Sequence, residues 1–472
     1  MTPQKLQGIA NYLRDKIKNT KFENHVFLVG GCVRDYLLGD NVNDIDIAVD
    51  LPNGGVEFAN WITKEELCYK PDYNPCTVGR MDTCRFYLST KEDLKYVVFD
   101  CCQTRKNPSY SLPEGSKVSE NLGTILQDGN LRDLTVNAMF LDVSSMAITD
   151  VCHGIDDMQD KILRTPNLPS VTFKDDPLRM MRVIRFATKY GWGIEKDTWL
   201  GIVEHHNLIT SVSVERFKDE LNQILLSPCP SVGLKKLMAS GMLYDMIPQL
   251  YNLNHVGESL NVKIPFNIWE KTLEEVDETE PRLINRLAAL FRCVGKATAV
   301  KYIEGNIKFY GYETISVNVT SAILRTLKYP NHIIESVALC IKYHSYFSNY
   351  LVHGLQPSKK TVRKFLTEVG DWKPNVLDLI RAVAIVENIT AFNNFTDLKC
   401  IISDTEAELD YTNFKIPITG DEIMKSLNLS PSPLIGKIID HLKDKYLDDP
   451  SLTKEELLQM AEDYKLSIVS FE

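Results

Sequence analysis

Asp44 and Asp46, two acidic residues separated by one isoleucine, form the part of the sequence best suited to chemistry. The apolar residues 47–49 follow them, and this composition is typical of a buried strand. Because side chains alternate along a strand, both carboxylates are expected on the same face. Neighbouring carboxylates repel each other, and a divalent cation such as Mg²⁺ would relieve that repulsion. Two exposed acids on an edge strand are the alternative for this motif alone.

A phosphate-binding turn is predicted shortly before this acidic pair. A short apolar run ends at Gly30 and Gly31, and helical spacing then resumes from Val33 to Leu38. Backbone amides of a glycine turn and of the following helix N-terminus can bind an anion, and Arg34 in the first turns could reach a triphosphate. An ordinary strand-to-helix turn is the alternative, but the turn and the acidic pair together favour a nucleotide site.

A second apolar run, YVVFDCC at residues 96–102, is predicted to be a strand that carries Asp100. If it pairs beside the first strand, Asp100 could be a third carboxylate at the metals. An acid at a strand end in solvent is at least as good an explanation. Arg105 follows in TRKNPSY and is a candidate for the same cleft as these carboxylates.

The segment LRDLTVNAMFLDV, residues 131–143, starts with an Arg-Asp pair and then becomes apolar. A helix N-terminus carrying Arg132, Asp133 and Asn137 could contact a triphosphate or a ribose. A capped core helix explains the same residues, and this stretch alone does not decide between the two.

The segment DDPLRMMRVIRFATKYGW, residues 175–192, carries three arginines spaced by three residues, Arg179, Arg182 and Arg185. Asp176 lies three residues before the first of them, and Pro177 suits a first helical turn. On a helix these residues form a slanting stripe of one Asp and three Arg. Arginine makes planar, bidentate hydrogen bonds, so Asp with Arg could pair with a base edge while the others bind phosphate. A charged solvent face is the alternative.

The elements that must position these residues divide the chain of 472 residues into an α/β part and a helical part. Short β-type runs dominate to about residue 150, and helical periodicity dominates from about residue 175. The net charge of −10 opposes general nucleic-acid binding but allows a local basic surface. The amphipathic first 18 residues, the lack of a membrane-length apolar run and 11 cysteines without a C-x-x-C pair predict a cytoplasmic protein with reduced thiols.

In this order the motifs strongly resemble the class II tRNA nucleotidyltransferases, the CCA-adding enzymes, and the related bacterial poly(A) polymerases. The similar segments are LVGGCVRDYLLGDNVNDIDI, LRDLTVNA, DVCHGIDDMQDKILRTP, DDPLRMMRVIRFA and ERFKDELNQILLSP, between about residues 25 and 230. The resemblance implies an α+β fold, with a polymerase-β-like head of mixed sheet and helices and an elongated all-α body. The implied domains are a head at 1–150, a helical neck at 151–250, a degenerate HD-like domain at 251–365 and an RNA-binding tail at 366–472.

The resemblance also implies roles for individual residues. Asp44 and Asp46 would bind catalytic Mg²⁺, with Asp100 as a further catalytic candidate, and Asp176 with Arg179 would choose between CTP and ATP. The nucleotide-binding residues would be Gly30, Gly31, Arg34, Arg132, Asp133, Asn137, Asp176, Arg179, Arg182 and Arg185. Two departures from the family pattern, Leu131 for an arginine and Asp175 for a glutamate, leave the matched residues in place.

The body resembles HD phosphohydrolase domains that have lost their metal ligands. Lys271, Arg292-Cys293 and Tyr312 stand where such domains carry His, His-Asp and His, and only His344 looks retained. One neutral ligand cannot hold a metal beside two cations, so we expect an HD-like fold without phosphohydrolase activity.

The resemblance implies template-independent addition of CCA to tRNA from CTP and ATP by two-metal nucleotidyl transfer. A poly(A) polymerase, a CC-only or an A-only enzyme is the alternative of the same class. By the same resemblance, the segment 66–92 could contain the loop that permits the switch from CTP to ATP, and because this segment is not short, full CCA addition is favoured. A non-catalytic RNA-binding protein is the alternative of another class. The basic run SKKTVRK, with Lys359, Lys360, Arg363 and Lys364, is a candidate RNA contact or a solvated helix face, and the oligomeric state is left open.

Overall fold

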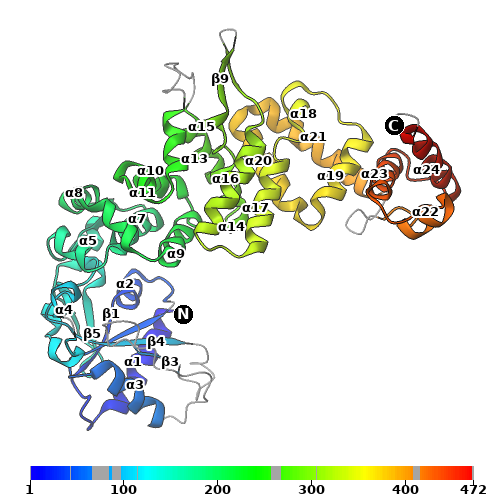
Figure 1. Ribbon diagram of the computed structural model, residues 1–472. Coiled ribbons are helices and arrows are strands. Elements are labelled where there is room, and N and C mark those ends of the chain that lie inside the picture. Colours follow the sequence, from blue (N-terminus) through cyan, green and yellow to red (C-terminus); the bar gives the residue numbers. More distant parts are fainter. Residues whose placement is uncertain are drawn as a thin grey trace. The chain divides into compact units, whose positions relative to one another are not determined.

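The computed structural model describes residues 2–42, 44–65, 84–87, 97–113, 115–256, 267–303, 306–407 and 415–469. The chain forms two compact units, residues 1–248 and 249–472, each described by itself (Figure 1). Of the segment 66–92, only residues 84–87 lie among those described, so the expected nucleotide-switching loop lies mostly outside them. None of the described helices is both long and apolar enough to cross a membrane.

A six-stranded mixed sheet forms the centre of the first unit, in the order β3-β4-β2-β1-β5-β6. Strand β2 pairs with β4 in parallel, whereas the other neighbours are antiparallel. The strands are β1 (Val26–Val29), β2 (Ile45–Val49), β3 (Cys84–Tyr87), β4 (Val98–Gln103), β5 (Met139–Asp142) and β6 (Ile148–Asp150). The predicted mixed-sheet head is therefore confirmed, and each β-type run of the sequence contributes a strand.

Helices bury one face of this sheet in a continuous apolar core. The amphipathic N-terminal segment forms helix α1, whose Leu6 and Leu13 are buried with Ile45 and Ile47 of β2. Helix α3 adds Phe58, whose ring meets that of Phe22 edge-on at 5.2 Å. The helices are α1 (Pro3–Ile17), α2 (Gly31–Leu38) and α3 (Gly54–Glu65). With its apolar side chains covered, β2 leaves Asp46 on the other face.

The segment 131–143 differs from its prediction, because no helix begins there. Helix α4 (Ile125–Gly129) ends just before it, and Arg132 and Asp133 follow in irregular turns. Asn137 ends the 3-10 turn η4 (Thr135–Asn137), and β5 starts two residues later. The apolar residues expected on a buried helix face belong to this strand instead.

Helices dominate the first unit after the sheet, with the short strands β7 (Ile162–Leu163) and β8 (Gly193–Ile194) paired in parallel. The predicted arginine helix is α7 (Leu178–Tyr190), which packs against α9 and α10. The helices are α5 (Gly154–Asp160), α6 (Pro169–Asp175), α7, α8 (Lys196–His205), α9 (Val214–Leu225), α10 (Pro230–Ser240), α11 (Met242–Met246) and α12 (Pro248–Tyr251), which spans the boundary to the second unit.

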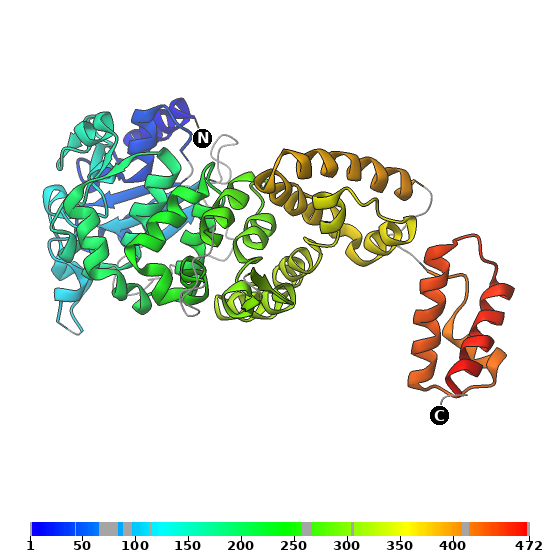
Figure 2. The same cartoon turned by 90° about the horizontal axis from the view of Figure 1, so that it is seen from above.

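In the described residues of the second unit, the structure is helical apart from one antiparallel hairpin, β9 (Val300–Ile303) with β10 (Asn306–Phe309). Its last three helices pack on one another around a core of their own, seen in orange and red in Figure 2. The helices are α13 (Ile268–Glu278), α14 (Leu283–Phe291), α15 (Lys296–Ala299), α16 (Tyr312–Thr326), α17 (Asn331–Tyr343), α18 (Ser348–His353), α19 (Lys359–Val369), α20 (Lys373–Glu387), α21 (Ile389–Glu406), α22 (Gly420–Leu427), α23 (Pro433–Asp448) and α24 (Lys454–Val469).

Three of the positions compared with HD metal ligands lie together in a buried polar cluster. The hydroxyl of Tyr312 is 3.0 Å from Nε2 of His344, and Nη1 of Arg292 is 3.4 Å from the same nitrogen. The Arg292 guanidinium also donates to the carboxylate of Glu275, and both side chains are buried. Burial and the Arg292 charge lower the pKa of His344 to about 3, so this ring stays neutral. Lys271, outside this contact set, pairs with Glu387 at 3.3 Å.

We predict that Arg292→Met destabilises the protein by about 3–5 kcal/mol, because it leaves the buried Glu275 carboxylate without its cation. The free energy of unfolding from urea titration measures this loss. The double variant Arg292→Met with Glu275→Leu removes both charges and should recover most of it. An Arg292→Met protein as stable as the wild type would contradict a structural role for this ion pair.

Candidate active site

The glycine turn lies directly against one of the two predicted metal-binding carboxylates. In the β1–β2 ladder Val29 is paired with Asp46, so the turn that follows β1 passes beside this residue. Gly30 has a φ of +78°, and a Cβ built there would be 2.9 Å from Oδ2 of Asp46. The position therefore requires glycine for its backbone conformation and for the close approach. Helix α2 begins at Gly31, two residues before Val33, where the sequence predicts that helical spacing resumes.

Asp46 lies in a strongly charged environment. Its side chain is partly buried on β2, while Asp44, just before the strand, is exposed. Burial raises the pKa of Asp46 to about 6, against the opposing effect of Arg132 and with a further increase from Asp100. Extra positive charge beside these carboxylates would lower that pKa again, which is the electrostatic condition for a cation site.

Asp100 lies beside Asp46, as expected if the two strands pair, because β2 and β4 place them opposite each other in parallel register. Both carboxylate oxygens of Asp100 accept hydrogen bonds from Arg85 of β3, each at 2.8 Å. Asp100 thus adds negative charge near Asp46 while an arginine occupies its own oxygens.

A cavity of about 240 Å³ joins the glycine turn, the acidic pair and the arginine helix. Its walls come from α2, β2, the segment around η4, and α7, which are distant in sequence. The predicted residues that line it are Gly30, Gly31, Arg34, Asp44, Asp46, Arg132, Asp133, Asn137, Arg182 and Arg185. The structure thus gathers ten of the predicted residues at one site, and Phe186 and Lys189 join them.

Arg34 is buried in this wall and held in a fixed position. Its Nη1 donates to Oδ1 of Asn137 at 2.5 Å, and its Nε and Nη2 donate to Asp35 at 2.8 and 2.7 Å. The guanidinium also lies over the ring of Phe186, 4.7 Å from its centroid. Tyr190 donates to the same Asp35 oxygen at 3.0 Å. These contacts connect the turn, η4 and α7.

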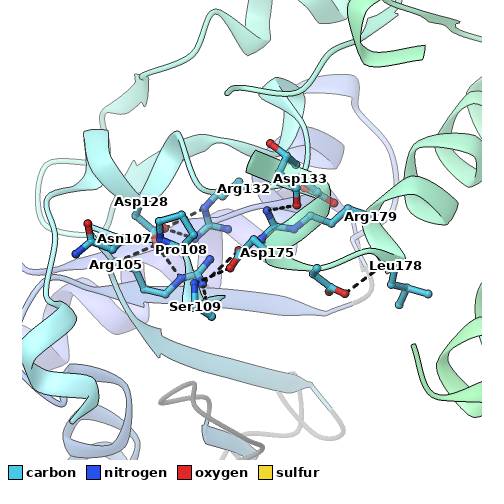
Figure 3. A network of polar contacts seen from close by, with 12 residues as sticks. Arg105, Asn107, Pro108, Ser109, Asp128, Arg132, Asp133, Asp175, Leu178 and Arg179 are labelled. Carbon is cyan, nitrogen blue, oxygen red and sulfur yellow. Dashed lines mark hydrogen bonds and ion pairs between the residues drawn. The ribbon is translucent and has the colours of Figure 1, made fainter. Parts of the chain in front are cut away.

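A second cavity of about 400 Å³ adjoins the first, because Arg132, Asp133 and Arg182 line both. Asp176 and Arg179, the residues expected to choose the nucleotide, line this larger cavity. Figure 3 shows the polar network around it, with Arg105, Asp128, Arg132, Asp175 and Arg179 converging from three segments of the chain.

Asp176 lies outside the helix on which the sequence placed it. It is the C-cap of α6 with an extended backbone, and Pro177 separates it from α7. Its carboxylate accepts a hydrogen bond from Arg216 of α9 at 2.7 Å. The stripe on α7 itself therefore consists of three arginines, with Asp176 at its N-terminal end.

The side chain of the neighbouring Asp175 is buried and anchors Arg179. It accepts from Nη2 of Arg179 at 3.0 Å and from the backbone N–H of Ser109 at 2.7 Å, and Nη1 of Arg105 lies 3.6 Å away. Arg105 thus lines the larger cavity and not the smaller one with Asp44 and Asp46, where the sequence predicts it. Asp175, which replaces the usual glutamate of the family, therefore keeps a carboxylate that contacts Arg179, Ser109 and Arg105.

Acidic partners hold the other arginines as well. Arg182 donates to Asp133 at 2.8 Å, and Arg185 donates to Glu220 of α9 at 2.6 Å. Although burial opposes it, Arg182 and the hydrogen bond from Asn137 hold the pKa of Asp133 below its usual range. Asp133 therefore stays charged and orients Arg182 in the wall shared by the two cavities.

Sequence reasoning missed three acidic partners of these arginines, Asp128, Asp175 and Glu220, and it missed Arg216, the partner of Asp176. Asp128 is not among the predicted site residues, and it accepts a hydrogen bond from Nη2 of Arg132 at 2.8 Å. Its spacing of four residues is an available signal for this pair. No local spacing connects Arg185 with Glu220, which lies 35 residues later.

The basic run SKKTVRK does not present all its cations to solvent. Arg363 is buried, and its Nη1 donates to the backbone oxygens of Leu447 and Asp448 at 3.1 and 2.9 Å. Lys360 pairs with Asp444 at 2.7 Å and with Asp448 at 2.6 Å. These two residues thus connect α19 to α23 within the second unit.

The arrangement as a whole suits a nucleoside triphosphate with a divalent cation. The smaller cavity offers amides, arginines and two carboxylates. The larger one offers a carboxylate and a guanidinium that could meet a base edge. Among the residues with described positions, no group of three or more His, Cys, Asp or Glu could hold a metal. Two carboxylates with substrate phosphates are the usual ligand set for Mg²⁺, so the residues present fit that ion.

Two family models match the chain. The first describes the poly(A) polymerase head domain and matches residues 26–164. The second describes a probable RNA- and SrmB-binding site of polymerase A and matches residues 191–253. All the predicted site residues from Gly30 to Asn137 fall within the first match, and the arginine helix α7 lies largely between the two.

Similar proteins extend over almost the whole chain. A mitochondrial CCA tRNA nucleotidyltransferase of Candida glabrata is 26% identical over 91% of this chain and 89% of its own. A CC-adding tRNA nucleotidyltransferase of Thermus thermophilus is 25% identical over 91% of both. The Bacillus stearothermophilus CCA-adding enzyme, solved with CTP, shares the fold with a TM-score of 0.66 and 18% identity over 99% of both chains. Residues 26–164 thus match the poly(A) polymerase head domain and residues 191–253 its RNA-binding region, and the chain as a whole is similar to tRNA nucleotidyltransferases that add CCA or CC.

Proposed function

We propose that the protein is a tRNA nucleotidyltransferase that adds CCA to tRNA 3′ ends from CTP and ATP, releasing pyrophosphate. The observation that carries the proposal is the pair of adjoining cavities. One gathers Asp44 and Asp46 with the glycine turn, and the other contains Asp176 and Arg179. The name of the Candida glabrata relative supports CCA addition, whereas the Thermus thermophilus relative is named for the CC-adding alternative.

In this proposal the residues of the smaller cavity bind the triphosphate and its metal ions. The amides at Gly31 and the start of α2, with Arg34, Arg132 and Arg185, bind phosphate oxygens. Asp44 and Asp46 would hold Mg²⁺, with Asp100 contributing charge from the neighbouring strand. The chemistry such metal ions supply is activation of the RNA 3′-hydroxyl and neutralisation of the leaving pyrophosphate. The remaining residues of the site contribute by positioning the substrates and by electrostatic stabilisation.

Asp176 and Arg179 choose the nucleotide. A carboxylate accepts hydrogen bonds and a guanidinium donates them, so together they can meet both sides of a base edge. In the structure Arg216 and Asp175 hold these two groups. A base must therefore exchange at least part of these contacts for its own.

The proposed substrate is tRNA, recognised by shape and backbone because one enzyme must serve every tRNA. We also propose that the domains end at residues 150, 250 and 365 and that the HD-like body has no phosphohydrolase activity. A cytoplasmic location is a further part of the proposal, although the Candida glabrata relative is named as mitochondrial.

Three forms of one tRNA transcript test the proposed activity: one lacking CCA, one ending in C and one ending in CC. Each is incubated with Mg²⁺ and CTP, ATP or both, and product length is read on a gel. We expect extension that stops at CCA on all three. Addition that stops at CC identifies the CC-adding alternative, and a long ladder with ATP alone identifies a poly(A) polymerase. The absence of any extension would leave a non-catalytic RNA-binding protein.

The matched variants for this assay are Asp44→Asn and Asp46→Asn, with Asp160→Asn on the exposed surface of α5 as control. We expect each active-site variant to lose incorporation by at least about a hundredfold, as when a group that stabilises transition-state charge is removed. The affinity for tRNA, measured by fluorescence anisotropy, should stay the same. Incorporation that survives both changes would contradict the assignment of the metal-binding pair.

Asp46→Asn should also raise the melting temperature in the absence of divalent cations. The raised pKa of about 6 means that the folded protein binds a proton at Asp46 more tightly than the unfolded chain. Charged Asp46 therefore lowers stability as pH rises from about 4 to 6, and asparagine removes this cost. We expect a higher melting temperature for the variant at pH 8 and no difference below pH 4. An equal melting temperature at pH 8 would show that Asp46 is not electrostatically strained.

A further inference from the structure

The hairpin β9–β10 of the second unit combines lysines with exposed aromatic residues. It projects from the helices of that unit (Figure 1). Tyr302 and Tyr310 are 54% and 62% exposed, and Ile303 is 40% exposed. Single exposed apolar residues are normal on a protein surface, but here three large ones lie within nine residues of sequence. Exposed aromatic residues gathered on one element make that element a candidate for binding.

The pairing of the two strands places like charges opposite each other. Lys301 is the register partner of Lys308, so both side chains leave the same face of the hairpin. Both lysines are exposed. Like charges directly opposite each other are destabilising in a β-ladder, and an anion between them would remove that cost. Tyr302 is paired with Ile307 and lies on the opposite face.

A third lysine holds the base of the hairpin in place. The Nζ of Lys296 in α15 lies over the ring of Phe309, 5.4 Å from its centroid, and over that of Tyr312, 4.7 Å away. An isolated two-stranded hairpin is marginally stable in water, so this cation–π anchorage supports its fold. Because β9 and β10 are held at their base, the charged and aromatic side chains are presented in a fixed arrangement.

We propose that this hairpin is an RNA-binding element that contacts the tRNA substrate, with Lys301 and Lys308 on backbone phosphates and the exposed tyrosines on unpaired bases. Lysine–phosphate contacts and aromatic stacking are the two usual components of single-stranded RNA binding. In a chain with a net charge of −10, affinity for a polyanion must come from local surfaces of this kind. The inference rests on the proposed function, since it assumes an RNA substrate.

The test measures tRNA affinity of the full chain as a function of salt. Lys301→Gln with Lys308→Gln should weaken binding and reduce the slope of log affinity against log salt by about 2, one for each lost phosphate contact. The control pair Lys18→Gln with Lys64→Gln removes the same charge from exposed positions at the end of α1 and on α3, away from the sheet face that carries Asp46, and should leave that slope unchanged. A second variant, Tyr302→Ser with Tyr310→Ser, should weaken binding by about tenfold.

Two outcomes overturn the inference. If the lysine variant has the same affinity and slope as the wild type, the charges serve only to keep an exposed strand edge from pairing with other chains. If the control pair lowers the slope equally, the effect belongs to net charge and not to the hairpin. Wild-type extension of tRNA to CCA in the same preparation keeps the proposed function intact in both cases, whereas its failure would concern that function itself.

Discussion

The charge balance around Asp46 is the interaction on which the rest of the site depends. The β1–β2 register brings Asp46 against the Gly30 turn, and the β2–β4 register adds Asp100 beside it. Arg132 and Arg182 compensate part of this negative charge, but burial still raises the pKa of Asp46 to about 6. A site with this imbalance favours a cation. The sheet therefore acts as the scaffold that sets both the distance and the charge of the carboxylates.

The arginines of the two cavities are positioned before any ligand arrives. Each of four guanidinium groups is held by a different acidic residue, and three of those acids are themselves buried or nearly so. The pairs are Asp128–Arg132, Asp175–Arg179, Asp133–Arg182 and Glu220–Arg185. Fixed charges of this kind stabilise a triphosphate without reorganisation at the moment of reaction. The acids also keep the cluster stable when no phosphate is present, because an unpaired buried charge is costly.

Local patterns in the sequence predict the strands, and they single out residues that the structure gathers around one cavity. Alternation and glycine placement locate β1, β2 and the turn at Gly30, and the three-residue spacing of arginines locates α7. The segment 131–143 shows the limit, because a run of apolar residues fits a buried strand and a buried helix equally. Tertiary pairing with β1 decides in favour of β5.

Most acidic partners of the arginines cannot be predicted from local patterns in the sequence. Asp128 could be found because it lies four residues before Arg132, but Arg185 meets Glu220 only because α7 packs on α9. Likewise Asp176 meets Arg216 across the same pair of helices. Contacts between elements distant in sequence have no local signal, so a single sequence cannot reveal them. The same holds for the cluster of Arg292, Tyr312 and His344, which three separate helical segments bring together.

The most direct test of the account is calorimetric titration with CTP, in Mg²⁺ and in EDTA, of the wild type and of the double variant Asp44→Asn with Asp46→Asn. The account predicts that Mg²⁺ tightens binding to the wild type by at least about tenfold, because two carboxylates and the triphosphate share the ion. The double variant should bind CTP through its arginines with no gain from Mg²⁺. Equal affinity of the wild type with and without Mg²⁺, or the same gain in the double variant, would contradict the central role of this acidic pair.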